Sequence, residues 1–446
     1  MSCRGFALAL ALLSLAPEAA AQAPAQPDRA QPPPLELPGA AGATPLLLRD
    51  ALQRFRRESL ELLAARYELT ASRADVVSAG LLSNPWLSAQ GAFVAHGIPS
   101  GGQQELYLSL SQNIPVAGQV GLRRDAAQGF ASAQEREFAA VAWQLMGDLR
   151  LAYIDLQITE IKWRVVTLAT RDLERVQSII GERVAAGANA PYDRVRVAVE
   201  RSALQASVAQ SEAELVAARV ALARAVGKDI DVKGLVVPEA LDEPPEPPAD
   251  EEALVLRALA QRSDVAAARM RVAASDLRTR STARSYVPSP DVSVGYSRFF
   301  NIPTDAGPSG GGAITAGLSI PLPLFDRGQG ALGRSNAEAM SARVRSQQTE
   351  LLARREVESA AAVMRIRVVA WRRFRDIVAP DIERMRQMAE LAYREGRASI
   401  VELLDAHSTY VEAKQRAADL RGAALKASVQ LEQALGPSSP GAVPAP

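Results

Sequence analysis

Small and apolar residues repeat one pattern in two blocks of the chain, residues 184–227 and 393–436. The blocks have equal length without a gap, and their glycines coincide after a single shift, because 396 − 187 = 209 and 436 − 227 = 209. In both blocks these positions follow the 4,3,4,3 spacing of a coiled-coil seam. The pattern therefore predicts a duplicated helical hairpin with tight turns at 187–190 and 396–399. The seam positions are Leu204, Val208, Ser211, Leu215, Ala218, Leu222 and Ala225 in the first block, and Ala413, Ala417, Leu420, Ala424, Ala427, Leu431 and Ala434 in the second.

Two pairs of segments alternate between apolar and polar residues instead, which is typical of strands. The first pair is 86–96 and 106–111, separated by the turn-forming run 97–102. The second pair is 292–297 and 314–320, separated by a predicted loop at 301–312. Each pair predicts a β-hairpin, and the strands approach the ~9 to 11 residues that a tilted strand needs to cross a bilayer.

Helical patterns surround the hairpins in the same order in both halves. A helix is predicted over 46–82, ending where Ser83 and Asn84 precede Pro85. After the first hairpin the helical pattern continues to Gly187, for more than sixty residues without a proline. At ~1.5 Å per residue such a helix is about 100 Å long, so we expect it to project from any compact domain. The second half repeats this plan with helices over 251–286 and 326–395, and Pro380 is the expected kink.

Composition divides the chain into six segments. Arg4, an apolar run and Ala19–Ala21 predict a signal peptide over 1–21, cleaved near Ala21. The other expected segments are a disordered or extended Pro-rich lead-in (22–45), a first structural repeat (46–235), a Pro-rich acidic linker between the halves (236–250), a second repeat (251–436) and a disordered tail (437–446).

Charge and cysteine content exclude several classes of protein. The 51 basic and 50 acidic residues leave a net charge of +1, whereas a nucleic-acid partner needs a clustered basic face. Hydrophobic residues make up 48% of the chain but aromatic residues only 5%, which suits long, closely packed helices. The only cysteine, Cys3, lies in the predicted signal peptide, so we expect no disulfide, thiolate metal site or lipid anchor in the mature chain.

The remaining chemical motifs favour structural roles. His96 and His407 are the only histidines and lie in different predicted elements, so no metal site is expected. The run 310–312 is three glycines without the Lys-Ser or Lys-Thr that follows a phosphate loop. No nucleophile, base and orienting group can be assembled. We therefore predict neither a cofactor nor an enzymatic activity. Trp86 and Tyr107 fit either an interfacial aromatic belt or core packing.

The four predicted strands require partners from other chains if they cross a membrane. After the signal segment the chain has no uninterrupted apolar stretch of ~18 residues, so no transmembrane helix is expected. Spanning segments must satisfy every backbone group, and four strands cannot close around a lumen. An open sheet edge is not tolerated in lipid. Several chains would therefore have to share one barrel.

The doubled order of helix, strand pair, long helix, turn and return helix resembles TolC-type outer membrane efflux proteins. The most specific matches are 400–406 (IVELLDA), which looks like the family's gate-bearing segment, and 320–330 (IPLPLFDRGQG) at the end of the second hairpin. The LFDRxQG ending is most similar to the heavy-metal cation branch, the CzcC-like proteins. Some relatives carry a lipidated N-terminal cysteine, and this sequence departs from them. The resemblance implies an α+β membrane protein, internally duplicated, in which a homotrimer joins four strands per chain into a transmembrane β-barrel above a long α-helical coiled-coil barrel in the periplasm.

The resemblance also implies a function and partners. The expected function is a passive outer membrane exit duct of a tripartite efflux system, located in the bacterial outer membrane and extending into the periplasm. Its expected partners are outer membrane lipid, a periplasmic adaptor (membrane fusion protein) and an inner-membrane transporter of the RND type. The substrate could be a heavy-metal cation, an organic compound or a secreted polypeptide. The alternative is a periplasmic coiled-coil adaptor, which would carry one hairpin flanked by small β-domains and would remain in solution without detergent.

Two sets of residues are candidate sites. By resemblance the turns would dock the adaptor, through Gly187, Ala188 and Asn189 in one copy and Gly396, Arg397, Ala398 and Ser399 in the other, while both glycines would also end their helices. By the same resemblance Glu402 and Asp405, three apart on one helix face, would line the periplasmic entrance as a ring of carboxylates that attracts cations. The alternative is a solvated acidic face. The equivalent positions in the first copy are Asp193 and Arg196, so the acid pair occurs only once.

Overall fold

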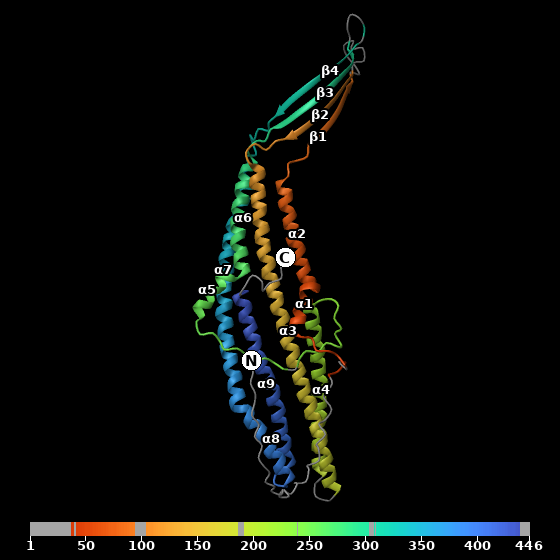
Figure 1. The fold of residues 1–446 in the computed structure, drawn as a ribbon, viewed down its shortest axis with the longest axis vertical. Helices are drawn as coiled ribbons and strands as arrows, with labels where there is room; N and C mark the ends of the chain where they lie inside the picture. The colour runs from red at the N-terminus through yellow and green to blue at the C-terminus, as the bar shows by residue number, and fades with distance from the viewer. Residues whose placement is uncertain are drawn as a thin grey trace, which may run out of the picture. The chain divides into compact units, whose positions relative to one another are not determined.

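The computed structural model describes residues 37–39, 42–93, 104–185, 191–238, 240–302, 307 and 309–437, all within one compact unit of the chain (Figure 1). The predicted signal peptide, the turn 187–190 and the tail beyond Pro437 lie outside the described residues. The elements are α1 (Leu48–Glu58), α2 (Leu60–Gly80), β1 (Trp86–Phe93), β2 (Gln104–Asn113), α3 (Gln119–Ala185), α4 (Pro191–Val226), α5 (Glu251–Gln261), α6 (Ser263–Ser285), β3 (Asp291–Ile302), β4 (Ser309–Ser319), α7 (Gln329–Arg373), the π-helical turn η1 (Phe374–Val378), α8 (Ala379–Arg394) and α9 (Ile400–Leu435).

The duplication is present in the arrangement of the helices. α4 and α9 both have 36 residues, and their ends are separated by the same shift, because 400 − 191 = 209 and 435 − 226 = 209. Every position of the two predicted seams is buried or half-buried. α4 returns along α3, and α9 packs between α7, α8 and α3 (Figure 1). The predicted hairpin helices are therefore confirmed. None of the helices in the described ranges combines the length and apolar content needed to cross a membrane.

The two helices predicted over 46–82 and 251–286 are each wrong as single helices. The first breaks at Ser59, whose backbone is extended and whose hydroxyl accepts the Leu62 N–H at 3.3 Å, capping α2. The second breaks at Arg262, where the backbone is also extended. There the guanidinium binds Asp264 at 2.7 Å and Glu356 of α7 at 2.6 Å. Local side-chain bonds thus compensate for the interrupted backbone ladder.

The irregularity predicted at Pro380 takes the form of a π-helical turn. The turn covers Phe374–Val378, directly before α8. Because Pro380 has no N–H, the carbonyl of Asp376 loses its helical donor, and a wider turn accommodates the gap. The structure thus contains two successive helices, α7 and α8, where the sequence pattern predicts one.

The strands form one antiparallel sheet in the order β1-β2-β3-β4. The pairing of β2 with β3, for example Leu110 opposite Val294, joins the two predicted hairpins into a single sheet. The strands continue from α2, α3, α6 and α7 at the end opposite the helical turns (Figure 1). The predicted loop at 301–312 is wrong at both ends, because β3 runs to Ile302 and β4 begins at Ser309. The glycines at 310–312 lie in β4, where a Cβ on Gly312 would meet the Tyr296 hydroxyl oxygen at 2.6 Å.

The Pro-rich linker is packed across the helices of both repeats. Val237 N–H donates to the fully buried Glu160 of α3 at 3.3 Å. Gln157 Nε2 donates to the carbonyl of Pro238 at 3.0 Å. Because prolines lack N–H groups, the side chains of α3 supply donors to linker carbonyls. The end of the predicted lead-in is also ordered, since Leu37 is buried and Arg219 of α4 donates to the Pro38 carbonyl at 2.7 Å.

Candidate functional site

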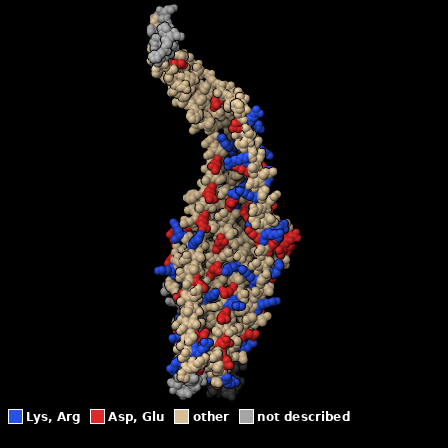
Figure 2. All heavy atoms as spheres, turned by 180° about the vertical axis from the view of Figure 1, so that it is seen from behind, with Lys and Arg blue, Asp and Glu red and all other residues tan. Residues whose placement is uncertain are grey.

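The sheet has one apolar face and one polar face. The register places mostly apolar residues on one face and mostly polar residues on the other over all four strands. The exceptions include Trp86 and Phe299 on the polar face and Gln104 and Gln112 on the apolar face. Figure 2 shows a surface over the sheet with few charged side chains, whereas acidic and basic groups are spread over the helices. A sheet of this kind can separate an apolar medium from water. The apolar face carries Leu87, Ala89, Phe93, Leu106, Leu108, Leu110, Val292, Val294, Tyr296, Phe300, Ile314, Ala316 and Leu318, with Arg298, and the polar face carries Ser88, Gln90, Glu105, Tyr107, Ser109, Ser111, Asp291, Ser293, Ser297, Thr315 and Ser319.

Glycines on the sheet make room for tyrosines on both faces. On the polar face a Cβ on Gly295 would meet the Tyr107 ring at 2.7–2.8 Å, and the Thr315 hydroxyl lies 3.4 Å from the Tyr107 hydroxyl. Tyr107 is therefore half-buried among polar-face neighbours. Trp86, by contrast, is 76% exposed at the start of β1.

Both outer strands of the sheet have an unpaired edge within one chain. β1 pairs only with β2, and β4 pairs only with β3. The backbone N–H and C=O groups along those edges have no partner strand among the described residues. Edges of this kind either bind another strand or must be covered.

The described tip is the turn between α8 and α9. Gly396 has a positive φ of 72°, which favours glycine, and the Arg397 N–H donates to the Ala392 carbonyl at 2.9 Å to close the end of α8. Gly396, Arg397 and Ser399 are exposed, and Ala398 is half-buried. Arg397 also pairs with Glu395. The other predicted docking residues, Gly187, Ala188 and Asn189, lie outside the described residues.

Glu402 and Asp405 are both exposed on α9, directly beside this tip. Glu402 has a role that the sequence analysis missed, because its carboxylate accepts the Ser399 N–H at 2.9 Å while Ser399 Oγ accepts the Glu402 N–H at 3.3 Å. This is a capping box, and the signal was the Ser-x-x-Glu spacing from 399 to 402. Glu402 therefore stabilises the N-terminus of α9, independently of any role at an entrance. Asp405 makes no comparable side-chain bond.

A buried apolar cluster holds the two helical hairpins together above the tip. It joins α3 and α4 to α8 and α9, and His407 of α9 is buried next to it. Burial lowers the pKa of His407, and Arg386 of α8 acts in the same direction. Asp172 of α3, Glu200 of α4 and Glu390 of α8 oppose that shift. The cluster contains Leu173, Ile180, Val197, Tyr393, Ile400, Leu403 and Leu404.

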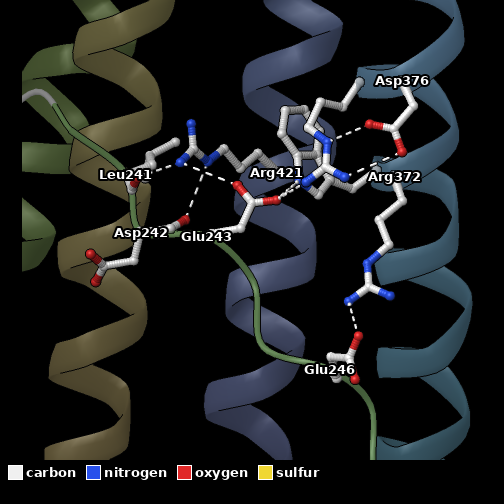
Figure 3. A network of polar contacts seen from close by, with 9 residues as sticks. Leu241, Asp242, Glu243, Glu246, Arg372, Asp376 and Arg421 are labelled. Carbon is white, nitrogen blue, oxygen red and sulfur yellow. Dashed lines mark hydrogen bonds and ion pairs between the residues drawn. The ribbon is translucent and has the colours of Figure 1, made fainter.

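A polar network connects the linker to the π-helical turn (Figure 3). One carboxylate, Glu243, accepts from Trp371 Nε1 at 3.0 Å and from Arg375 Nη1 at 2.5 Å, and lies 3.4 Å from Arg421 Nη2. Arg421 also donates to the Leu241 carbonyl at 2.6 Å. These donors come from α7, η1 and α9. An acidic residue between prolines is the only feature of the sequence that hints at this network.

The comparisons with known proteins agree on one class. Residues 254–437 match the family model described as outer membrane efflux protein. Residues 254–437 thus form an outer membrane efflux protein domain. The chain is 24% identical over 397 residues to the cobalt-zinc-cadmium resistance protein CzcC of Cupriavidus metallidurans, covering 88% of this chain and 91% of that protein. It is 25% identical over 334 residues to the pyoverdine export outer membrane protein OpmQ of Pseudomonas putida, covering 74% of this chain and 69% of that protein.

The fold of the chain is that of solved outer membrane channels. It superimposes on the Campylobacter jejuni CmeC outer membrane channel with a TM-score of 0.73 at 15% identity, covering 87% of this chain and 85% of that one. The resemblance to TolC-type efflux proteins, including CzcC, and the α+β channel fold are therefore confirmed. Within the described ranges no three His, Cys, Asp or Glu side chains gather as a candidate metal site. His96 lies outside those ranges.

Proposed function

We propose that this protein is the outer membrane exit duct of a tripartite efflux system, formed by three copies that pool their strands into a twelve-stranded barrel. The observation that carries the proposal is the sheet with one apolar face, one polar face and two unpaired edges. In lipid an unpaired edge leaves backbone groups without partners, at a cost of several kcal/mol each. Pairing β4 of one copy with β1 of the next removes every edge. The polar face then lines a passage wide enough for solutes.

The helices extend this passage on the periplasmic side. α3 has 67 residues, about 100 Å at ~1.5 Å per residue, so it reaches far beyond the sheet. The exposed residues of the tip, including Gly396 and Ser399, are available to a periplasmic adaptor. The adaptor would in turn connect the duct to an inner-membrane transporter of the RND type, which supplies the energy. The duct itself would be passive.

The proposed cargo is a heavy-metal cation. The support is the similarity to CzcC, a cobalt-zinc-cadmium resistance protein, over most of both chains. Exposed carboxylates beside the tip, Glu402 and Asp405, are suited to attract cations at an entrance. The alternative cargo is an organic compound, supported by the similarity to a pyoverdine export protein.

Two measurements test this proposal. Detergent-extracted protein should have the mass of a trimer and should form ion-conducting pores in a planar bilayer, whereas a monomer without conductance, or a protein that stays in solution without detergent, would contradict it. Deleting the gene should then sensitise cells to Co²⁺, Zn²⁺ and Cd²⁺. Unchanged metal tolerance with loss of siderophore or drug export would assign the organic cargo instead.

A further inference from the structure

The contact between the two repeats inside one chain is a template for the contact between copies. Each repeat has the same order of elements, α2-β1-β2-α3 in the first and α6-β3-β4-α7 in the second. Inside the chain the end of the first repeat meets the start of the second, through β2 with β3 and α3 with α6. In a closed ring, the end of the second repeat, β4 and α7, must meet the start of the first repeat, β1 and α2, of the next copy.

We propose that neighbouring copies pair β4 with β1 in the register of β2 with β3, and that the connector after β4 packs on the connector before β1. This inference rests on the proposed shared barrel. The repeats are related by the prolines that bound the strands, 321 − 115 = 206 and 290 − 85 = 205. Asn113 faces Asp291 inside the chain. The shifts 113 + 206 = 319 and 291 − 205 = 86 place Ser319 opposite Trp86 of the neighbouring copy.

This register keeps the two faces of the sheet intact across the boundary. The residue numbers of two facing residues always add up to 405 in this register. Leu318 therefore faces Leu87 on the apolar face, and Thr315 faces Gln90 on the polar face. All eight residues of β1 find partners in β4, from Ser319 down to Gly312. A slip by one residue would put polar side chains on the apolar face, so only even shifts compete with this register.

The strand ends agree with the same register. Inside the chain the Ile114 N–H donates to the Pro290 carbonyl at 2.9 Å, just beyond the last strand pair. The same shifts turn this bond into Ile320 donating to Pro85 of the next copy. The isoleucine and the proline are thus present at both boundaries.

The boundaries differ in the connector that follows the outgoing strand. Gly118 and Gly328 both have positive φ and both precede the glutamine that starts the next helix, but 328 − 118 = 210 exceeds the strand shift of 206. The connector after β4 is therefore four residues longer. It carries Leu322, Leu324 and Phe325, all more than half exposed, and Phe325 is 92% exposed.

A matching apolar surface lies where the register places the neighbouring copy. Leu81 and Leu82, on the connector between α2 and β1, and Trp86, the first residue of β1, are also more than half exposed. The equivalent contact inside the chain is polar, because Gln119 Nε2 donates to the Val287 carbonyl at 3.2 Å and Asn113 Nδ2 donates to the Ser289 carbonyl at 3.3 Å. The longer connector thus replaces polar bonds with an apolar clasp between copies, which removes both surfaces from water.

Cysteine pairs test the register directly in the full-length protein. Cys3 is the only cysteine of the sequence, so the background is simple once it is replaced. The Cα atoms of directly opposed residues in a sheet lie ~4.5–5.5 Å apart, which a disulfide can bridge. The Cα atoms of residues offset by two positions lie too far apart for a disulfide. The pair Thr315→Cys with Gln90→Cys should give mainly covalently closed trimers on oxidation. The pair Thr315→Cys with Ser88→Cys should give few. Preference for the second pair, or no cross-link in either, would overturn the register.

A separate pair of variants tests the clasp. Phe325→Ser should lower the temperature at which detergent-solubilised trimers dissociate, whereas Val116→Ser, in the equivalent connector inside the chain, should not. A fluorophore at residue 325 should resist quenching by brominated phospholipids. Strong quenching, or equal effects of the two variants, would assign the connector to lipid and overturn the clasp. A conducting wild-type trimer that fails these tests would leave the duct intact, whereas a monomeric wild type would contradict the duct itself.

Discussion

Replacing Glu243 by Ala should loosen the π-helical turn without unfolding the chain. Glu243 binds donors from α7, η1 and α9 together (Figure 3). No residue of η1 is fully buried, and η1 is attached by Phe374, which packs against the apolar core, and by the pair of Arg375 with Glu243 of the linker. Removing that carboxylate should therefore increase local opening of residues 371–378 more than opening elsewhere.

The magnitude follows from the burial of each partner. Trp371 is only 7% exposed, so leaving its indole N–H without an acceptor costs about 1–3 kcal/mol. The pair with Arg421 involves side chains about a third to a half exposed and contributes roughly 0.2–1 kcal/mol. The indole N–H and the Arg421 pair together contribute about 1–4 kcal/mol. Glu246 offers a matched control in the same linker, since it is 85% exposed and pairs only with Arg372, at 3.2 Å, which contributes about 0.5 kcal/mol.

Hydrogen exchange measured on peptides covering the turn is the appropriate assay. A difference of about 2 kcal/mol between the two variants corresponds to roughly 30-fold faster exchange in Glu243→Ala than in Glu246→Ala. Trp371→Phe removes the indole donor, so Glu243→Ala should cost less in that background than in the wild type. Equal exchange in the two linker variants would refute the argument that Glu243 holds the turn.

Three further predictions concern the tip. Glu402→Gln with Asp405→Asn removes two charges while glutamine preserves the capping box, so trimers should form normally but lose cation preference in planar-bilayer recordings; unchanged selectivity would remove these residues from the entrance. Ala398→Trp should abolish export while membrane insertion remains normal, whereas normal export would argue against docking at this turn. Burial lowers the pKa of His407 below its ordinary value of 6.5, so folding stability should be constant above about pH 7 and fall as the pH drops through 6.5, where the unfolded chain binds a proton more readily than the folded one. His407→Gln should flatten this dependence in thermal melts, and an unchanged slope would assign it to other groups.

Much of the fold follows from periodicity. The seam positions of α4 and α9 are predictable because a 4,3 spacing can bury only one stripe of a helix. The strands are predictable because an alternating pattern puts Leu108 and Ser109 on opposite faces. The alternation does not show the pairing of β2 with β3, which lie far apart in the sequence and meet only because both repeats place their hairpins at the same end.

The missed features depend on single side chains rather than on patterns. Ser59 interrupts a helix because its hydroxyl caps the next one, and no periodicity records that. Gly312 belongs to a strand because the Tyr296 ring occupies the space beside it, so a run of glycines that suggests a turn has a packing reason instead. Glu243 forms its network with residues more than a hundred positions away.

α8 buries fewer residues than the other long helices. Among its residues, all of which are described, only Tyr393 is buried. Most substitutions on such a helix change stability by less than about 0.5 kcal/mol, so they fall within the margin that natural proteins carry. Substitutions at exposed positions of α8, such as Arg384, Met388 and Leu391, should therefore leave folding intact. The proposed duct can therefore acquire a new partner through changes at these positions of α8 while α3 and α9 keep their sequence.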